Sequence, residues 1–443
     1  QVVAGWLDPV ALPKMFDKLV TAHWLIAAAL IVLPLLFSLR IQVNRFSLNG
    51  FYRNRLDRAF LGAARKNRKA SPFTGFSSQD NVRMNLLKPV AGGKAVLYPV
   101  INVALNVTQS ENLAWQERKA EPFIFSPCYS GSGMLIPEVP LGGTERVGAY
   151  IPSDVYGGSE PDFGMRGSGV SLATAMSISG AAASPNMGYH SSPATAFLMT
   201  LFNVRLGAWL PNPARAKTLG NDVGLSGPGR SLRPILYELA GATNDQGKEI
   251  YLSDGGHFEN LGLYEMIRRR CRFIVVSDAG ADPECSFEDL GNAVRKVKID
   301  LGIDIDFEEL RISSRTKPVR PQFAWALGKI AYPEGEGHLL YIKPSFFGDH
   351  VPVDIRSYAS RSATFPHETT ADQFFSESQF ESYRHLGLVL TSELGNAGSY
   401  GDLATFFADV EIEHQKIRAE LGSSCEQLKT WLRDCVAPPA SEG

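Results

Sequence analysis

The chain has 443 residues, of which 44% are hydrophobic, 20% charged and 10% aromatic, and its formal net charge is −2. This composition is that of a globular protein and excludes global disorder, while the nearly neutral charge excludes a general attraction to nucleic acid. The length allows two or three domains, or one large α/β domain with extensions.

The first predicted element is an apolar helix over residues 20–40. Residues 24–39 carry no charge, and with the residues just before them they reach the roughly twenty residues needed to cross a bilayer. We expect a transmembrane helix here, with a buried core helix or an interfacial hairpin as the alternatives.

Charge differs on the two sides of this helix. Residues 1–19 carry balanced charges, whereas nine arginines and lysines follow between Arg40 and Lys69 against Asp57 alone. The positive-inside rule therefore predicts a membrane protein whose main domain faces the cytoplasm. The basic stretch could rest on anionic headgroups or form an ordinary solvated helix.

Strand and helix patterns alternate through the rest of the chain. Residues 131–169 and 213–229 have the composition of loops. The segment over 249–277 reads as strand, helix and strand, which suggests a parallel crossover unit. The expected elements are strands over 95–107, 249–253, 273–277 and 338–343, and helices over 194–210, 234–240, 261–270, 287–301 and onward from 370.

The most informative segment covers residues 251–262. An apolar strand ends at Asp254, and Gly255 and Gly256 lead directly into a helix. Because glycine has no side chain, a backbone or a substrate can come close to this turn. The pattern places one carboxylate at the rim of a sheet, where α/β proteins carry chemistry. The same residue could instead be a turn or helix-cap aspartate.

Two segments together resemble a known family. They are SISGAAASP at 177–185 and SDGG at 253–256 with ENLG at 259–262, and a later block over 365–384 agrees with them. They are similar to the patatin-like phospholipases, in particular a bacterial membrane-linked branch related to the cytosolic phospholipase A enzymes. The resemblance covers residues 44–387 and implies a three-layer α/β/α fold that is incomplete at its N-terminus.

The family uses a serine–aspartate dyad, and the resemblance makes Asp254 its base within the motif completed by Gly255 and Gly256. A carboxylate can take the serine proton when it is close, partly desolvated and correctly aimed. The resemblance also implies a substrate-pocket wall. Its residues would be Ser179, Gly180, Ser184 and Pro185.

The family's nucleophile motif, G-x-S-x-G, is absent from this sequence, as is a glycine-rich oxyanion loop. The segment most similar to this motif is GLSG at 224–227, which contains Ser226. A nucleophile elbow needs a strand before the serine and a helix after it, and the sequence predicts neither at Ser226. We therefore expect the nucleophile to lie upstream of Gln1, and this chain to be the base-bearing C-terminal portion, inactive by itself.

Other candidate residues favour structural roles. His257 is expected to make a local hydrogen bond, since a dyad leaves it no necessary task. Asp278 and Asp282 fit a turn better than a metal site, because their loop offers no complete set of oxygen ligands. The five cysteines have neither zinc-ligand nor disulfide spacing. No metal and no organic cofactor is expected.

The favoured hypothesis is a membrane-associated acyl hydrolase acting on a phospholipid or lysophospholipid. A catalytically inactive membrane-tethered lipid-binding or scaffold protein is the alternative, and acyl transfer to an alcohol is a third. The predicted organisation is an N-terminal flank (1–19), the transmembrane helix (20–40), a basic juxtamembrane segment and linker (41–80), the patatin-like catalytic region (81–390) and a C-terminal helical extension (391–443).

Overall fold

The computed structural model divides the chain into two compact units, Gln1–Asn260 and Leu261–Gly443, called here the N-terminal unit and the C-terminal unit. The division falls inside the predicted region 81–390. The structure describes residues 22–29, 32, 36–37, 41–45, 47–63, 65–77, 79–89, 97–108, 117–137, 148–158, 169–187, 192–318, 322–346, 351–369, 372, 374–392, 394, 400–416 and 418–419.

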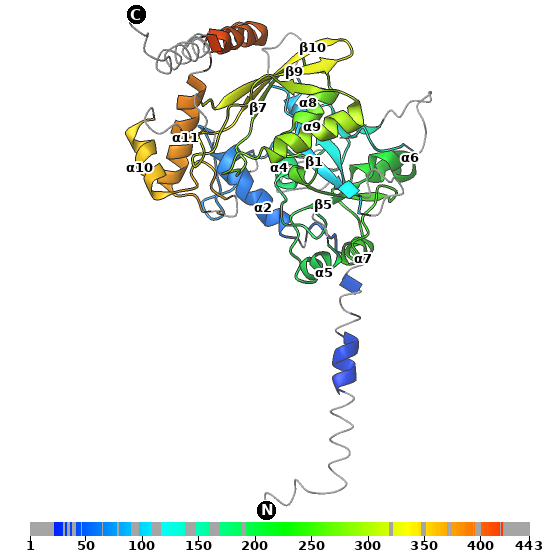
Figure 1. Cartoon of the computed structure of the whole chain (residues 1–443). Helices are drawn as coiled ribbons and strands as arrows, with labels where there is room; N and C mark the ends of the chain where they lie inside the picture. Colours follow the sequence, from blue (N-terminus) through cyan, green and yellow to red (C-terminus); the bar gives the residue numbers. More distant parts are fainter. Residues whose placement is uncertain are drawn as a thin grey trace, which may run out of the picture. The chain divides into compact units, whose positions relative to one another are not determined.

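The N-terminal unit is built on a six-stranded sheet in the order β4-β3-β2-β1-β6-β5, with every neighbouring pair antiparallel. Figure 1 labels two of its strands, β1 and β5. Its strands alternate buried apolar residues over a core that includes Phe123, Phe125 and Tyr156. The strands are β1 (Ile101–Asn106), β2 (Ala120–Phe125), β3 (Tyr129–Ser132), β4 (Ala149–Pro152), β5 (Ala208–Pro211) and β6 (Glu249–Asp254).

The strand β6, which lies between β1 and the edge strand β5, carries the predicted base. β6 pairs with β1 up to the Val103–Asp254 position, and with β5 only up to the Ala208–Leu252 position. Four consecutive residues of β6 are buried, as expected for a strand covered on both faces. The strand predicted over 249–253 is therefore confirmed, and Asp254 is its last residue.

The helices of this unit are short, and α2 contacts α4. Ser171 caps α4, because its hydroxyl accepts the amide of Thr174. The α-helices are α2 (Asn49–Leu56), α4 (Leu172–Ser179), α5 (Pro193–Leu201), α6 (Ala216–Leu219) and α7 (Leu232–Leu239). A π-helical turn (Asp57–Gly62) follows α2, and 3₁₀ turns cover Met84–Leu87, Pro213–Arg215, Gly220–Gly224 and Gly255–His257.

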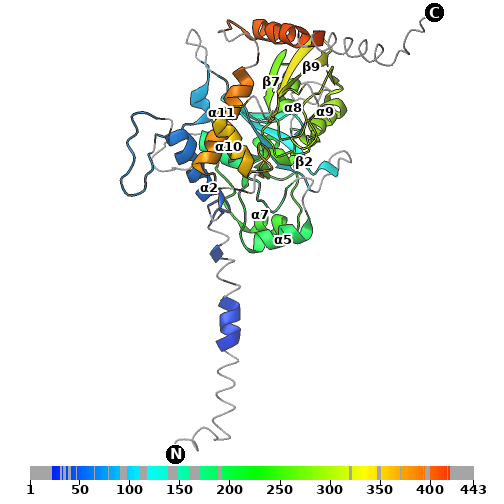
Figure 2. The same cartoon turned by 60° about the vertical axis from the view of Figure 1, so that its left-hand side comes forward.

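The C-terminal unit holds a four-stranded sheet in the order β7-β10-β9-β8, in which β7 runs parallel to β10 and the other pairs are antiparallel. Helices α10 and α11 lie side by side (Figure 2). The strands are β7 (Phe273–Ser277), β8 (Ile305–Phe307), β9 (Trp325–Tyr332) and β10 (Gly335–Ile342), and the helices are α8 (Leu263–Arg268), α9 (Glu288–Leu301), α10 (Val353–Arg361) and α11 (Glu377–Ser392).

Three sequence predictions are corrected. The parallel crossover is wrong, because β6 and β7 belong to different sheets and β7 takes β10 as its parallel partner. The helix predicted over 194–210 ends at Leu201, and the strand β5 follows it. The loop predicted over 131–169 contains β4. The chain is a mixed α/β protein.

The predicted membrane segment is only partly described. Residues 22–29, 32 and 36–37 are helical, and the other residues of 20–40, like the flank 1–19, lie outside the described ranges. Within those ranges, none of the helices combines the length and the apolar character needed to cross a bilayer.

Candidate functional site

Asp254 stands where β6 passes into the 3₁₀ turn Gly255–His257. Its Oδ1 accepts the backbone N–H of Gly256 at 2.8 Å, so the residue is a helix-cap aspartate in its geometry. Within the described residues its carboxylate has no other hydrogen bond and no ion pair. One oxygen is therefore committed to the turn, and the other is left for further contacts.

Burial decides the acidity of this carboxyl group. Burial raises the pKa of Asp254 above its ordinary value, and the hydrogen bond from Gly256 offsets only part of that rise. None of the described lysines and arginines lowers the pKa of Asp254. A carboxylate in this state keeps more basicity than an exposed one, which suits a general base.

The phenol of Tyr52, from α2, lies close to this carboxylate. Burial and the negative charge of Asp254 both raise the pKa of Tyr52. The hydroxyl of Tyr52 also rests on Gly180, where a Cβ atom would lie 2.6 Å from the phenol oxygen. Gly180 thus leaves room for a hydroxyl beside the candidate base. The sequence did not predict that Tyr52 belongs to this site. It showed only that Tyr52 lies in a segment of basic and aromatic residues.

The carbonyl of Asn102 in β1 joins the two predicted motifs. Ser179 donates its hydroxyl to this oxygen at 2.8 Å, and a Cβ atom on Gly255 would lie 2.8 Å from the same oxygen. A side chain at residue 255 would therefore meet backbone. The structure brings Ser179 next to the Asp-Gly-Gly turn, and the role of Ser179 and Gly180 as a substrate-pocket wall stays a prediction.

Ser184 and Pro185 lie differently. Both are buried, and Ser184 is fully enclosed. The hydroxyl of Ser184 donates to the carbonyl of Ala181 at 3.0 Å and accepts the amide of Gly207 at 3.2 Å. These bonds serve close packing between two backbone segments, so the alternative of simple packing fits this pair.

Ser253 and His257 form a second pair at the same turn. Asn106 donates to the hydroxyl of Ser253 at 2.7 Å, and that hydroxyl lies 2.7 Å from Nδ1 of His257. Ser253 is fully buried and points to the opposite face of β6 from Asp254, since side chains alternate along a strand. His257 thus makes the local hydrogen bond that was predicted.

Ser226 and the two aspartates near residue 280 keep structural roles. Ser226 follows the 3₁₀ turn Gly220–Gly224, and no strand leads directly into it. The geometry of a nucleophile elbow is therefore absent at this residue. Asp278 forms a buried ion pair with Lys343 at 3.0 Å. Asp282 accepts the amide of Phe287 at 2.9 Å, which is a turn contact.

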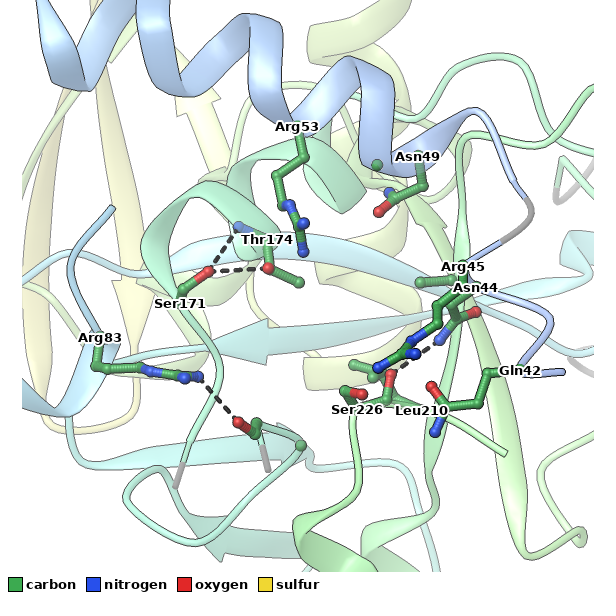
Figure 3. A pocket seen from close by; sticks show the side chains of 14 residues that line it. Gln42, Asn44, Arg45, Asn49, Arg53, Arg83, Ser171, Thr174, Leu210 and Ser226 are labelled. Atoms are coloured by element: carbon green, nitrogen blue, oxygen red, sulfur yellow. Dashed lines mark hydrogen bonds between the residues drawn. The ribbon is translucent and has the colours of Figure 1, made fainter. Parts of the chain in front are cut away.

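A separate cavity of about 470 Å³ lies in the N-terminal unit (Figure 3). Sequence reasoning did not find it, because its residues come from segments far apart in the chain. Neither Asp254 nor any other aspartate or glutamate is among its described lining residues. They are Gln42, Asn44, Arg45, Asn49, Gly50, Arg53, Arg83, Gly157, Gly158, Ser171, Thr174, Ala208, Leu210 and Ser226.

No protein-family model and no curated protein matches this chain. Among solved structures, human GIVD cytosolic phospholipase A2 matches with 16% identity and a TM-score of 0.37, over 66% of this chain and 44% of that one. The chain therefore spans less than half of the phospholipase. The weak likeness makes a phospholipase its structural neighbour and establishes neither a shared fold nor a shared activity. The resemblance to patatin-like phospholipases stays a prediction.

Proposed function

We propose that this chain is the base-bearing part of a membrane-associated lipid acyl hydrolase of the phospholipase or lysophospholipase type. The proposal includes a three-layer α/β/α patatin-like arrangement in the intact protein, with the main domain on the cytoplasmic side. The observation that carries it is the state of Asp254, a half-buried carboxylate with a raised pKa, no cationic partner among the described residues and an Asp-Gly-Gly turn around it.

In the proposed reaction Asp254 takes the proton of a serine hydroxyl as that oxygen attacks the ester carbonyl. The raised pKa favours this transfer, because a base works best when its pKa lies nearer the working pH. The ester C–O bond then breaks, Asp254 returns the proton to the leaving glycerol oxygen, and the acyl group stays on the serine. Water gives a proton to Asp254 as it attacks this acyl-serine, the serine oxygen leaves and takes the proton back, and the fatty acid is released. We propose that the serine and its oxyanion donors are supplied by residues outside this chain.

The second support is a hydroxyl group beside Asp254. The hydroxyl of Tyr52 lies near this carboxylate and takes the space that a Cβ atom on residue 180 would fill. A hydroxyl is thus accommodated next to this carboxylate. Ser179 and Gly180 are the proposed pocket wall, whereas the packing of Ser184 and Pro185 gives them no separate place in it.

The proposal is tested by fatty-acid release from phosphatidylglycerol and lysophosphatidylglycerol vesicles with the intact protein. Asp254→Asn should lower kcat at least 100-fold, because removal of a general base costs about 10²–10⁴ in rate. Asp222→Asn is the matched control, since Asp222 is an exposed aspartate of the same unit. Full activity of the Asp254→Asn protein would remove this carboxylate from the mechanism.

The chain itself gives a complementary test. Alone, it should not turn over a simple ester such as p-nitrophenyl butyrate. Hydrolysis that disappears on Ser226→Ala would place the nucleophile on this chain and contradict the proposed division of the dyad.

A catalytically inactive lipid-binding or scaffold protein is the second candidate, and the helix-cap geometry of Asp254 favours it. It predicts vesicle binding without fatty-acid release by the intact protein. Acyl transfer would instead show as a new lipid ester when glycerol is added.

A further inference from the structure

We infer that the cavity of the N-terminal unit binds a phosphate group, either on a lipid headgroup or on a small soluble phosphate ester. This deepens the proposed function, on which its relevance to lipid substrates rests, but phosphate binding can be measured without any acyl hydrolysis. The inference starts from the polar residues that line the cavity.

Three arginines reach the cavity from three separate parts of the chain (Figure 3). Arg53 extends from α2, and Arg45 from the segment ahead of α2. Arg83 comes from an extended residue that forms a β-bridge with Ser171 just before the turn Met84–Leu87. A guanidinium is always charged and presents its N–H groups in a planar fork that matches phosphate oxygens. Three such groups around one cavity form a strong field for an anion.

Hydrogen bonds to backbone carbonyls hold the Arg83 side chain and the residue that precedes Arg45. Arg83 is 7% exposed and donates to the carbonyl of Gly158 at 3.1 Å and to that of Gly169. Asn44 donates to the carbonyls of Trp209 at 2.7 Å and Ser226 at 2.9 Å, which fixes the chain immediately before Arg45. Positions fixed in this way lose little freedom when a ligand binds.

The start of α4 adds to the positive field. The N-cap Ser171 and Thr174 of the first turn line the cavity. The amides of Ala173 and Thr174 are already bonded to side chains, at 3.0 Å and 3.2 Å, so the helix acts on an anion through its dipole. The N-terminal end of a helix favours negative charge nearby. The helix thus reinforces the three arginines.

Two carboxylates, Asp57 and Asp80, lie close to the arginine cluster. Asp57 lies one turn after Arg53, and its pKa is raised by burial and by Asp80, while Arg53 and Arg68 lower it. Asp57 is not among the lining residues. Asp80 forms ion pairs with Arg68 at 2.6 Å and with Arg65 at 3.3 Å. No described carboxylate therefore lines the space that an anion would enter.

The cavity and the candidate base share two helices. Arg53 lines the cavity and Tyr52, the next residue of α2, lies by Asp254. In the same way, Thr174 of α4 lines the cavity and Gly180, the C-cap of α4, lies by Tyr52. A helix rises about 9 Å over six residues. A phospholipid whose phosphate sits among the arginines would keep its esters within a short reach of Asp254.

The test uses the whole chain and its Arg53→Gln variant, with Arg55→Gln as the matched control. Arg55 is an exposed arginine on the same helix that stacks on Phe51 and does not line the cavity. Binding of inorganic phosphate and glycerol 3-phosphate is followed by calorimetry. Sedimentation is measured with vesicles of phosphatidylcholine, with and without phosphatidic acid. Circular dichroism checks that both variants are folded.

We expect Arg53→Gln to weaken phosphate binding about 10- to 100-fold, since a hydrogen bond to a charged group is worth about 1.5–3 kcal/mol. Arg55→Gln should change it less than threefold. Binding of the soluble phosphates identifies a small ester as a ligand, and Arg53-dependent binding of phosphatidic acid alone identifies a headgroup.

Two results would overturn the inference. One is the absence of binding to every phosphate probe, and the other is an equal loss in both variants, which would mean general surface attraction. Because no readout involves fatty-acid release, failure of the phosphate site is distinguishable from failure of the proposed hydrolase.

Discussion

The buried ion pair between Arg205 and Glu238 gives the sharpest stability prediction. The two side chains are 3% and 0% exposed, and their charged groups lie 3.0 Å apart. Glu238 also accepts the indole N–H of Trp209 at 2.6 Å, and Arg205 donates to the carbonyl of Val43 at 3.3 Å. The pair thus ties the segment before Arg45 to the sheet.

Arg205→Ala should destabilise the N-terminal unit by about 3–5 kcal/mol, because it leaves Glu238 charged and buried without its cation. For a unit of this size the loss corresponds to a fall in Tm of roughly 6–20 °C. Urea unfolding followed by tryptophan fluorescence measures it. The loss should shrink as the pH falls, since burial raises the pKa of Glu238 and the orphaned group protonates more readily still.

The double variant Arg205→Met with Glu238→Gln is the matched control. It removes both charges and keeps an acceptor for Trp209, so its loss should be no more than about 1 kcal/mol. A loss below about 1 kcal/mol for Arg205→Ala, or equal losses in the single and double variants, would refute the reasoning.

Three further predictions concern the candidate base, its turn and the C-terminal unit. Asp254→Asn should unfold at an equal or higher Tm than the parent at pH 7. A carboxyl group with a raised pKa stabilises the fold when protonated and loses that contribution as the pH rises through the raised value. Gly255→Ala should cost about 1–3 kcal/mol in urea unfolding, because its Cβ would lie 2.8 Å from the carbonyl of Asn102. Lys343→Met should cost about 3–5 kcal/mol, since it leaves Asp278 buried without a cation.

Each of these has a control or an opposing outcome. The higher Tm of the Asp254→Asn protein should disappear below about pH 4, where both proteins are uncharged at residue 254. A lower Tm of this variant at pH 7 would contradict the prediction. Gly387→Ala in α11 is the control for Gly255→Ala, because a Cβ atom at residue 387 would meet nothing within 4 Å. It should not destabilise the protein, since alanine favours a helix over glycine by up to about 1 kcal/mol. Unchanged stability of the Lys343→Met protein would contradict the third.

The sequence predicted where individual strands lie better than it predicted which strands pair in a sheet. The apolar runs of β6 and β7 predicted both strands to within a residue, because strand formation leaves a local pattern. Pairing is non-local, so nothing nearby showed that β7 would join β10. The run over 194–210 is apolar throughout, and such a run does not distinguish a helix from a strand. The break falls near Asn203, whose φ of 54° ends the helical path.

The candidate site was predictable in one part only. The turn of Asp254 and its glycines follows from a pattern that lies within a few residues of sequence, while the role of Asp254 as a base stays a prediction. Tyr52 and Arg53 belong to a segment whose charges suggested a membrane surface, and their places depend on the packing of α2 against α4. Arg83 depends on two glycine carbonyls far along the chain. No local signal carries contacts of that range.

The place of β6 between two hydrogen-bonded neighbours has a consequence for adaptation. The strand that ends in Asp254 cannot shift without breaking ladders on both sides, so its amides should be among the slowest in the unit to exchange with deuterium. Variation among related proteins is therefore expected to spare the position of this carboxylate. New specificities would arise from the short helices around it, whose replacement leaves the sheet intact.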